Sequence, residues 1–204
     1  MLNAAERGFL DALAAKSPTP AGGAAAAYAG AMAAALVAMV ARTTIGKKGY
    51  EKAERRMTKI VIEAEACRDK LVDGVGQDSA AFEAVLAARR LPESDEQKKA
   101  LENATLCAAQ VPLEIARTAN EVLKMATEVL QTGNFNALND AVCAAALADT
   151  AVDVSVLNAV ENLDALPDNA RARRLLKQAD RLVLSLDECR LRIGIVMVTR
   201  TQGS

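Results

Sequence analysis

Apolar residues recur along this chain at intervals of three and four positions, which is the spacing of one face of an α-helix. Short segments rich in Gly, Pro, Ser or Asn separate these stretches. No segment shows the strict alternation of apolar and polar residues that is typical of a half-buried strand. The pattern therefore predicts six helices, at about residues 3–16, 20–43, 51–91, 94–132, 136–163 and from 170 onward.

Several residues are of the types that begin or end helices. Thr19 is expected to cap the second helix, with Pro20 at its first position, where a missing N–H has no cost. Ser94 followed by Gln97 is a capping pattern for the fourth helix, and Gly133 is a typical residue at its end. These signals place short loops between the helices.

Other residues predict where a helix starts or bends. Asn3 and Glu6 resemble a capping box at the start of the first helix. Gly74 and Gly76 are expected to bend or split the third helix, because glycine weakens a helix. Pro112 is expected to kink the fourth helix, since proline removes one of its hydrogen bonds.

The composition agrees with a single helical domain. The 204 residues are enough for one domain with its own core, and no linker-like segment divides residues 1–204. Alanine, leucine and valine dominate, whereas the aromatic residues that strands favour make up only 2% of the chain. Six helices joined by short loops therefore predict an all-α, up-and-down multi-helix bundle.

Charge, histidine and cysteine content narrow the possible functions. The net charge is −1 with both signs scattered along the chain, which argues against a nucleic-acid partner or an anionic membrane surface. The chain has no histidine, so the commonest general base and metal ligand is missing. Its four cysteines lie far apart, and no secretory signal is visible at the N-terminus. We therefore expect a reduced, cytoplasmic protein.

The second predicted helix contains the most apolar part of the chain. Residues 21–41 carry no charge, are long enough to span a bilayer, and contain twelve alanines and three glycines. Strongly apolar residues are few among them, so we interpret the segment as a helix buried on all sides in a bundle rather than as a membrane span. Side chains this small suit the centre of a bundle or a contact between subunits, because they let neighbouring backbones come close.

Two adjacent glycines, Gly22 and Gly23, lie in the first turn of that helix. The first backbone amides of a helix have no partner within it, and without side chains there a ligand can reach them and the positive end of the helix dipole. The same glycines also suit tight packing of the helix against a neighbour. The spacing alone favours neither interpretation.

The segment GKKGY places Lys47 and Lys48 in a loop just past the other end of the same helix. It does not match a P-loop, because no Ser or Thr follows the lysines. One interpretation is a solvated loop. The other is a clamp for a carboxylate or a phosphate.

Asp78 interrupts an apolar face. If the third helix is continuous, Asp78 shares that face with Leu71, Val75, Phe82 and Val85. A carboxylate there is costly unless it is paired or used, so Asp78 is a candidate for a raised pKa and a role in proton transfer. The alternatives are a kink that turns Asp78 outward and a buried arginine partner.

Three other acids have simpler explanations from spacing alone. Asp140 lies in the first turn of the fifth predicted helix, where the helix dipole by itself favours an acid. Asp149 and Asp153 are four residues apart on one face, but no histidine accompanies them. A di-metal site of the ferritin kind, which uses Glu-x-x-His pairs, is therefore excluded.

Residues 17–50, SPTPAGGAAAAYAGAMAAALVAMVARTTIGKKGY, resemble the opening signature of the formiminotransferase-cyclodeaminase C-terminal family, which includes stand-alone bacterial methenyltetrahydrofolate cyclohydrolases. In that family the stretch usually reads Pro-Thr-Pro-Gly-Gly-Gly, then a helix of small residues, then Gly-Lys-Lys/x-Tyr. The resemblance covers nearly the whole chain, with further matches at DSAAF (78–82), VPL (111–113), GNFNALND (133–140) and NAVENL (158–163).

The resemblance implies an all-helical domain that forms homodimers and binds a folate substrate among its helix ends, without a metal or redox cofactor. Pro20, Gly22 and Gly23 would form a backbone bed for the ligand. Lys47 and Lys48 would meet acidic groups of the substrate.

The resemblance also assigns roles to two carboxylates. Asp78 and Asp140 would be acid–base or pterin-anchoring groups, and our hypothesis is that Asp78 handles the proton of the attacking water while Asp140 anchors the pterin or the cationic centre. The chain departs from the family pattern where Ala21 replaces the first glycine and where Asn139 replaces the more usual Ser or Thr. Both departures bear on substrate preference.

The function expected from this resemblance is hydrolysis of 5,10-methenyltetrahydrofolate to 10-formyltetrahydrofolate in one-carbon metabolism. The alternative is the sister reaction of a formiminotetrahydrofolate cyclodeaminase, which releases ammonia. No formiminotransferase domain is visible in the chain to supply that substrate, which favours the cyclohydrolase. A third interpretation is a non-catalytic helical dimer that binds a small anion or another protein.

Overall fold

The computed structural model describes residues 4–166 and 169–201. In this part of the chain it contains six α-helices, one short 3₁₀ helix and no strand, which confirms the predicted all-α bundle. The elements are α1 (Ala4–Ala14), α2 (Gly22–Thr44), α3 (Glu54–Arg89), α4 (Asp95–Thr132), η1 (Phe135–Ala137), α5 (Leu138–Asp164) and α6 (Ala170–Thr201).

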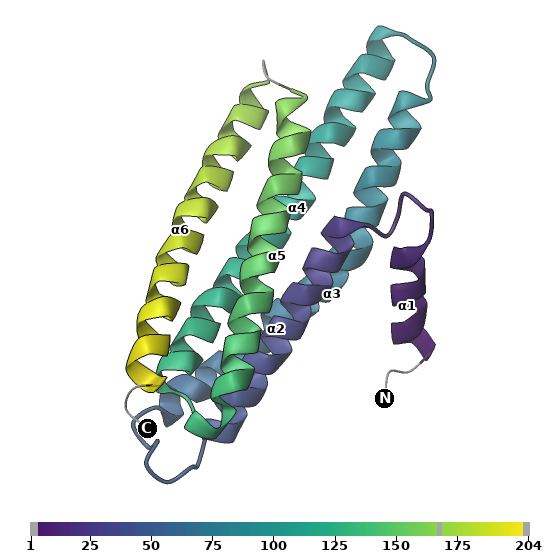
Figure 1. The fold of residues 1–204 in the computed structure, drawn as a ribbon. Helices are drawn as coiled ribbons and strands as arrows, with labels where there is room; N and C mark the ends of the chain where they lie inside the picture. The colour runs from purple at the N-terminus through teal and green to yellow at the C-terminus, as the bar shows by residue number, and fades with distance from the viewer. Residues whose placement is uncertain (1–3, 167–168, 202–204) are drawn as a thin grey trace.

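The helices α2 to α6 run up and down beside one another, and α1 lies to one side of the bundle (Figure 1). The helices differ in length: α3 and α4 have 36 and 38 residues, whereas α2 has 23. The hairpin of α3 and α4 therefore extends beyond the start of α2 (Figure 1). This overhang is where the candidate site lies.

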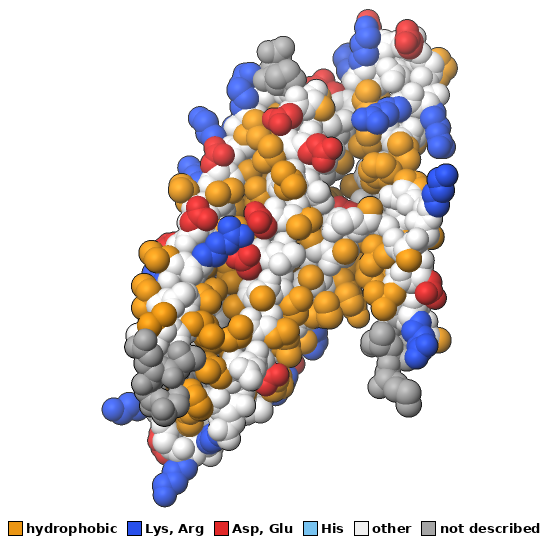
Figure 2. Space-filling model, viewed as in Figure 1, with side chains coloured by type: hydrophobic (Ala, Val, Ile, Leu, Met, Phe, Trp, Pro, Cys, Tyr) orange, Lys and Arg blue, Asp and Glu red, His pale blue; other side chains and the backbone are white. Residues whose placement is uncertain are grey.

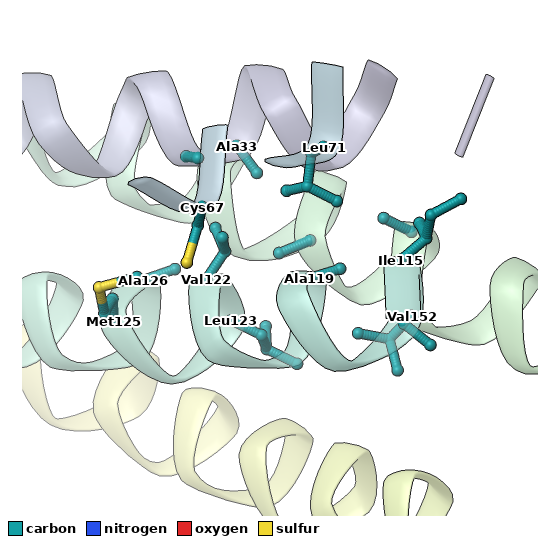
Figure 3. Close-up of a cluster of buried hydrophobic side chains, with 14 of the residues drawn as sticks. Ala33, Cys67, Leu71, Ile115, Ala119, Val122, Leu123, Met125, Ala126 and Val152 are labelled. Carbon is teal, nitrogen blue, oxygen red and sulfur yellow. The ribbon is translucent and has the colours of Figure 1, made fainter. Parts of the chain in front are cut away.

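The core is built around α4, which packs against α2, α3, α5 and α6. Figure 3 shows Ala119, Val122, Leu123 and Ala126 of α4 among the side chains of the neighbouring helices. Val122, Leu123 and Ala126 are completely buried. Full burial of a Val or Leu side chain stabilises the fold by about 1.5–3 kcal/mol, so these buried side chains of α4 stabilise the bundle.

The small-residue helix α2 packs against α3, α4 and α5. It is the described helix that is long and apolar enough to cross a membrane, and 61% of its most apolar window is buried inside the bundle. One flank stays open, however: Met32 is 40% exposed and Ala35 is exposed as well. The prediction that α2 is buried on all sides is therefore wrong, because α6 covers α4 and α5 and leaves the outer flank of α2 uncovered.

The first helix, α1, is attached to α2 through an aromatic contact. The rings of Phe9 and Tyr28 have centroids 5.1 Å apart. Leu10 on the same helix is 51% exposed. Figure 2 shows apolar side chains gathered between α1 and the bundle.

Two of the predicted helix ends are confirmed and one is wrong. Ser94 accepts a hydrogen bond from the Gln97 amide at 3.1 Å, and α4 ends at Gly133. The prediction for α2 fails because the helix begins at Gly22 after Ala21, without a side-chain cap from its own segment. The hydroxyl of Thr19 instead donates to a carboxylate of α3.

The residues that were expected to bend α3 and α4 lie inside continuous helices. α3 is continuous through Gly74 and Gly76, so the prediction of a split is wrong. Gly74 serves packing instead, since a Cβ there would lie 3.1 Å from Cγ1 of Ile115 on α4. α4 is helical on both sides of Pro112. The capping box at the start of α1 includes Asn3, which lies outside the described residues.

Candidate active site

A cleft of about 460 Å³ lies beyond the start of α2, under the overhang of α3 and α4 and beside the last turns of α5. Figure 2 shows the surface hollowed at this place. The described residues that line it are Pro18, Thr19, Ala21, Gly22 and Gly23 before and in α2, Asp78, Ala81, Phe82, Val85 and Arg89 of α3, Thr105, Ala108 and Pro112 of α4, and Asn158, Glu161, Asn162 and Ala165 at the end of α5.

Asp78 of α3 caps the N-terminus of α2. Its carboxylate accepts a hydrogen bond from the backbone amide of Ala24. It also fills the space over Gly23, where an added Cβ would lie only 2.2 Å from Oδ1 of Asp78. The segment before α2 supplies no side-chain cap. A carboxylate of α3 therefore accepts a hydrogen bond from one of the N-terminal amides that have no partner within α2.

The two glycines of α2 therefore have different roles. Gly23 is buried and is required by the close approach of Asp78. Gly22 is exposed and lines the cleft, and a Cβ there would meet nothing within 4 Å. Of the two interpretations open from the sequence, packing describes Gly23, and a ligand-facing backbone fits Gly22.

The environment of Asp78 changes its acidity. Burial raises the pKa of the Asp78 carboxyl above its ordinary value, and the hydrogen bond from Ala24 opposes part of this rise. Among the described residues Asp78 forms no ion pair, and the continuous α3 does not turn it away from the cleft. Both structural alternatives for Asp78 are therefore excluded within the described chain, and the predicted raised pKa is confirmed. A half-buried carboxyl of this kind is suited to proton transfer.

The predicted lysines lie at the opposite end of the bundle. Lys47 donates a hydrogen bond to Oδ1 of Asn134, and its Nζ lies 5.7 Å from the centroid of the Tyr50 ring. Lys48 is exposed, and Asp140 is half-buried in the first turn of α5. The helix α2 lies between these groups and the cleft. Its length from Gly22 to Thr44 is roughly 33 Å at 1.5 Å per residue. A single chain thus does not bring the lysines or Asp140 to Asp78.

The motif GNFNALND has a clear structural role at that end. The Asn134 amide donates to the hydroxyl of Thr44 at 2.8 Å, and its side chain donates to the carbonyl of Thr43 at 3.2 Å. The Phe135 amide donates to the hydroxyl of Tyr50 at 3.0 Å. These bonds tie the turn before α5 to the end of α2 and to the lysine loop.

The remaining predicted site residue, Pro20, lies next to the cleft without lining it. It is half-buried between Thr19 and Ala21, which both line the cleft. The two acids Asp149 and Asp153 bind Arg190 of α6, with their closest contacts at 2.7 and 3.1 Å. They therefore serve to attach α6 to α5.

A family model with the description Formiminotransferase-cyclodeaminase matches residues 6–181. The chain is also 38% identical over 180 residues to the methenyltetrahydrofolate cyclohydrolase of Methylorubrum extorquens, with 86% of each chain covered. The chain belongs to the formiminotransferase-cyclodeaminase family.

Two further relatives place this family member more closely. The crystal structure of a formiminotetrahydrofolate cyclodeaminase from Thermotoga maritima matches it with a TM-score of 0.88 and 32% identity over 98% of each chain. The formimidoyltransferase-cyclodeaminase of Rattus norvegicus is 30% identical over 202 residues, which are 97% of this chain and 37% of the rat protein. The family resemblance found in the sequence is thus confirmed over nearly the whole chain.

In this family member, the cleft includes an exposed aromatic ring and two charged side chains that were not predicted as site residues. Phe82 was assigned to the apolar face of α3 but is 42% exposed in the cleft. Arg89 and Glu161 bring a cation and a second carboxylate to the same cleft. A signal existed for each, because Asp78, Phe82 and Arg89 share a helical face and Glu161 lies within the matched segment NAVENL.

Proposed function

We propose that this chain hydrolyses 5,10-methenyltetrahydrofolate to 10-formyltetrahydrofolate. The observation that carries the proposal is the half-buried Asp78 carboxyl with a raised pKa, held at the N-terminus of α2 inside a cleft of about 460 Å³. The substrate class comes from the family and from the similarity to the cyclohydrolase of Methylorubrum extorquens. A cleft of this size is within the usual range for a small-molecule site.

The chemistry needs a base beside a cationic carbon. The methenyl carbon lies between two nitrogens that share a positive charge, so water adds to it readily. Ionised Asp78 takes a proton from that water as the C–O bond forms, and the adduct is neutral. The bond from the carbon to N5 then breaks, N5 takes up a proton, and the hydroxyl loses its proton to solvent as the formyl group forms on N10.

The charge of Asp78 serves this reaction twice. In the ground state it attracts the cationic ring system, and in the first step it accepts the proton of the attacking water. Its hydrogen bond from Ala24 holds it in one orientation. No redox step occurs. Each turnover releases one proton in total.

The sister reaction is the second candidate. The similarity in fold to a formiminotetrahydrofolate cyclodeaminase, with a TM-score of 0.88, favours it. The substrates of the two reactions share a folate scaffold. In that reaction Asp78 would handle a proton of the departing ammonia rather than of water. The third interpretation, a non-catalytic helical dimer, predicts no turnover of either compound.

One pair of assays separates these functions. The purified chain is incubated with 5,10-methenyltetrahydrofolate, and loss of the methenyl absorbance is followed; in parallel, ammonia release from 5-formiminotetrahydrofolate is measured. We expect faster turnover of the methenyl compound. Ammonia release that exceeds methenyl loss would assign the chain to the cyclodeaminases, and no turnover of either would contradict both enzymatic proposals.

We also propose that the chain works as a homodimer in which the lysine loop of one subunit approaches the cleft of the other. Two observations support it. The flank of α2 that includes Met32 is open and apolar, and it runs between the two ends of the bundle. A two-fold pairing along that flank would bring Lys47, Lys48 and Asp140 of the partner toward Asp78.

Mixing two defective variants tests this assembly. Asp78→Asn and the double variant Lys47→Ala, Lys48→Ala are each assayed alone, then unfolded together and refolded. If the site is shared, mixed dimers carry one intact site, and about a quarter of wild-type activity returns at low substrate concentration. Light scattering checks the dimer itself. An active monomer, or dimers without any recovery on mixing, would contradict the shared site.

A further inference from the structure

One face of α3 forms a continuous wall of the cleft. Asp78, Phe82, Val85 and Arg89 follow one another at helical spacing and all line it. From Asp78 to Arg89 the wall extends roughly 16 Å at 1.5 Å per residue. It carries an acid at one end, an aromatic ring in the middle and a cation at the other end.

Phe82 is unusual for an apolar residue at a helical core position. Its neighbours on this face behave as core residues, since Val85 is only 5% exposed, but Phe82 is 42% exposed. An aromatic side chain open to water inside a cleft leaves apolar area that a ligand ring can cover.

Arg89 is the cation that lines the cleft among the described residues. It lies in the last turn of α3, and none of the ion pairs formed within the described chain includes it. A guanidinium group binds a carboxylate through two parallel hydrogen bonds, which makes arginine a strong receptor for a carboxylate ligand. The next residue, Arg90, is also exposed but does not line the cleft.

We propose that Arg89 binds the glutamate carboxylate of the substrate and that Phe82 stacks on its aminobenzoyl ring. This inference rests on the proposed function, because it takes a folate derivative as the ligand. Such a molecule is a rod with a cationic ring system, then an aromatic ring, then an anionic glutamate. The order of acid, aromatic ring and cation along α3 matches it in charge and shape.

The match also fixes the direction in which the substrate lies. The methenyl carbon is placed at the Asp78 end, with Glu161 of α5 as a second carboxylate in the same cleft. The glutamate points toward the tip of the α3–α4 hairpin. The glutamate next to the aminobenzoyl ring is then bound by the same chain that supplies Asp78. The lysine loop of the partner subunit does not bind this glutamate.

The experiment compares two substrates that differ only in the glutamate. Methenyltetrahydrofolate and methenyltetrahydropteroate, which lacks the glutamate, are assayed with wild type, Arg89→Ala, Arg89→Lys and the control Arg90→Ala. We expect Arg89→Ala to raise KM for the folate about tenfold or more and to leave kcat and the pteroate KM unchanged. Arg89→Lys should fall between, and Arg90→Ala should match wild type.

Phe82 is tested by Phe82→Leu, which keeps apolar volume and removes the ring. Because both substrates contain the aminobenzoyl ring, KM should rise severalfold for both. An active enzyme in which Arg89→Ala leaves the preference for the glutamate intact would overturn the assignment of Arg89. If Lys47→Ala removes that preference instead, the tail belongs to the lysine loop.

Binding measurements keep this inference separate from the proposed function. Titration calorimetry with tetrahydrofolate and tetrahydropteroate gives the same comparison without turnover. A chain that turns over neither substrate but loses its preference for tetrahydrofolate in Arg89→Ala would contradict the enzymatic function and support the tail site. A chain that binds both ligands equally well in the wild-type form would overturn the tail site.

Discussion

The two ends of the bundle use similar polar residues in opposite ways. At the end with the lysine loop, the backbone amides of Asn134 and Phe135 donate to the hydroxyls of Thr44 and Tyr50. Lys47 also donates to the side chain of Asn134. At the cleft end, the Asp78 carboxylate accepts a hydrogen bond from one backbone amide and otherwise faces the cleft. The turn at Asn134 is satisfied by hydrogen bonds within the chain, whereas the cleft presents groups that a ligand can engage.

The family motifs therefore have different roles at the two ends. Residues of both ends fall within segments that match the family, so similarity alone ranks them equally. Their surroundings distinguish them. Burial makes the Asp78 carboxyl less acidic, so it is available for proton transfer. The side-chain amide of Asn134 already has three hydrogen-bond partners, so it holds the fold together.

The strongest test of the contrast compares the two carboxylates, one at each end. Asp78→Asn should lower kcat about 10²- to 10⁴-fold with little change in KM, because it removes the proposed base but keeps the shape. Asp140→Asn should raise KM at least as much as it lowers kcat. Asp73→Asn, on the exposed side of α3, is the control and should resemble wild type. Near-normal kcat in Asp78→Asn would show that the cleft end lacks the base.

A second test separates the two glycines within the cleft end. Gly23→Ala places a Cβ 2.2 Å from the Asp78 carboxylate, so the acid must move and kcat should fall about tenfold or more. Gly22→Ala adds a methyl group to open space and should keep kcat. It should also raise helix stability by up to about 1 kcal/mol. Kinetics and thermal unfolding on both variants decide this, and equal losses of kcat would contradict the division of roles.

The hydrogen-bonded turn at Asn134 should respond in stability rather than in chemistry. Asn134→Ala removes the bonds to the Thr43 carbonyl and the Asn136 amide, which are 3.2 and 3.0 Å long. We expect it to lower the free energy of unfolding by about 1–3 kcal/mol, measured with a denaturant, while kcat at saturating substrate stays normal. Asn139→Ala, exposed in the same segment, is the control. A large fall in kcat with normal stability would reverse the assignment of this end.

Asp78 should also make the stability of the fold depend slightly on pH. Its pKa is higher in the folded than in the unfolded chain, so ionisation weakens the fold as pH rises through the interval between the two values. Asp78→Asn, which keeps an oxygen for the Ala24 amide, avoids this loss. The variant should therefore unfold at a slightly higher temperature than wild type at neutral pH. The gap should close as the pH falls toward the ordinary value for Asp, and a constant gap would contradict it.

The sequence was informative wherever a short stretch is enough. Helical spacing located the six helices, because one face of each must meet the core. The cap at Ser94 and the end at Gly133 were predicted correctly because both depend on neighbours within one turn. The family signature around Gly22 and Gly23 was also local, so the resemblance was visible before the fold.

The failures all involve contacts between segments far apart in the chain. Thr19 is a good capping residue, yet Asp78 of another helix takes that place. Gly74 does not break α3, because its missing side chain makes room for Ile115. α2 was expected to be buried on all sides, but one flank is open, since the packing of α6 decides which flanks are covered.

An all-helical chain of this family and an acid on the apolar face of α3 were predictable, because periodicity and signature residues are properties of the linear order. The packing of the helices brings Asp78 to the start of α2 and places Phe82, Arg89 and Glu161 in the same cleft. It also placed the lysine loop at the other end of the bundle. The physical reason is that burial and charge act through distance in space, which the packing of five long helices sets and no local pattern records.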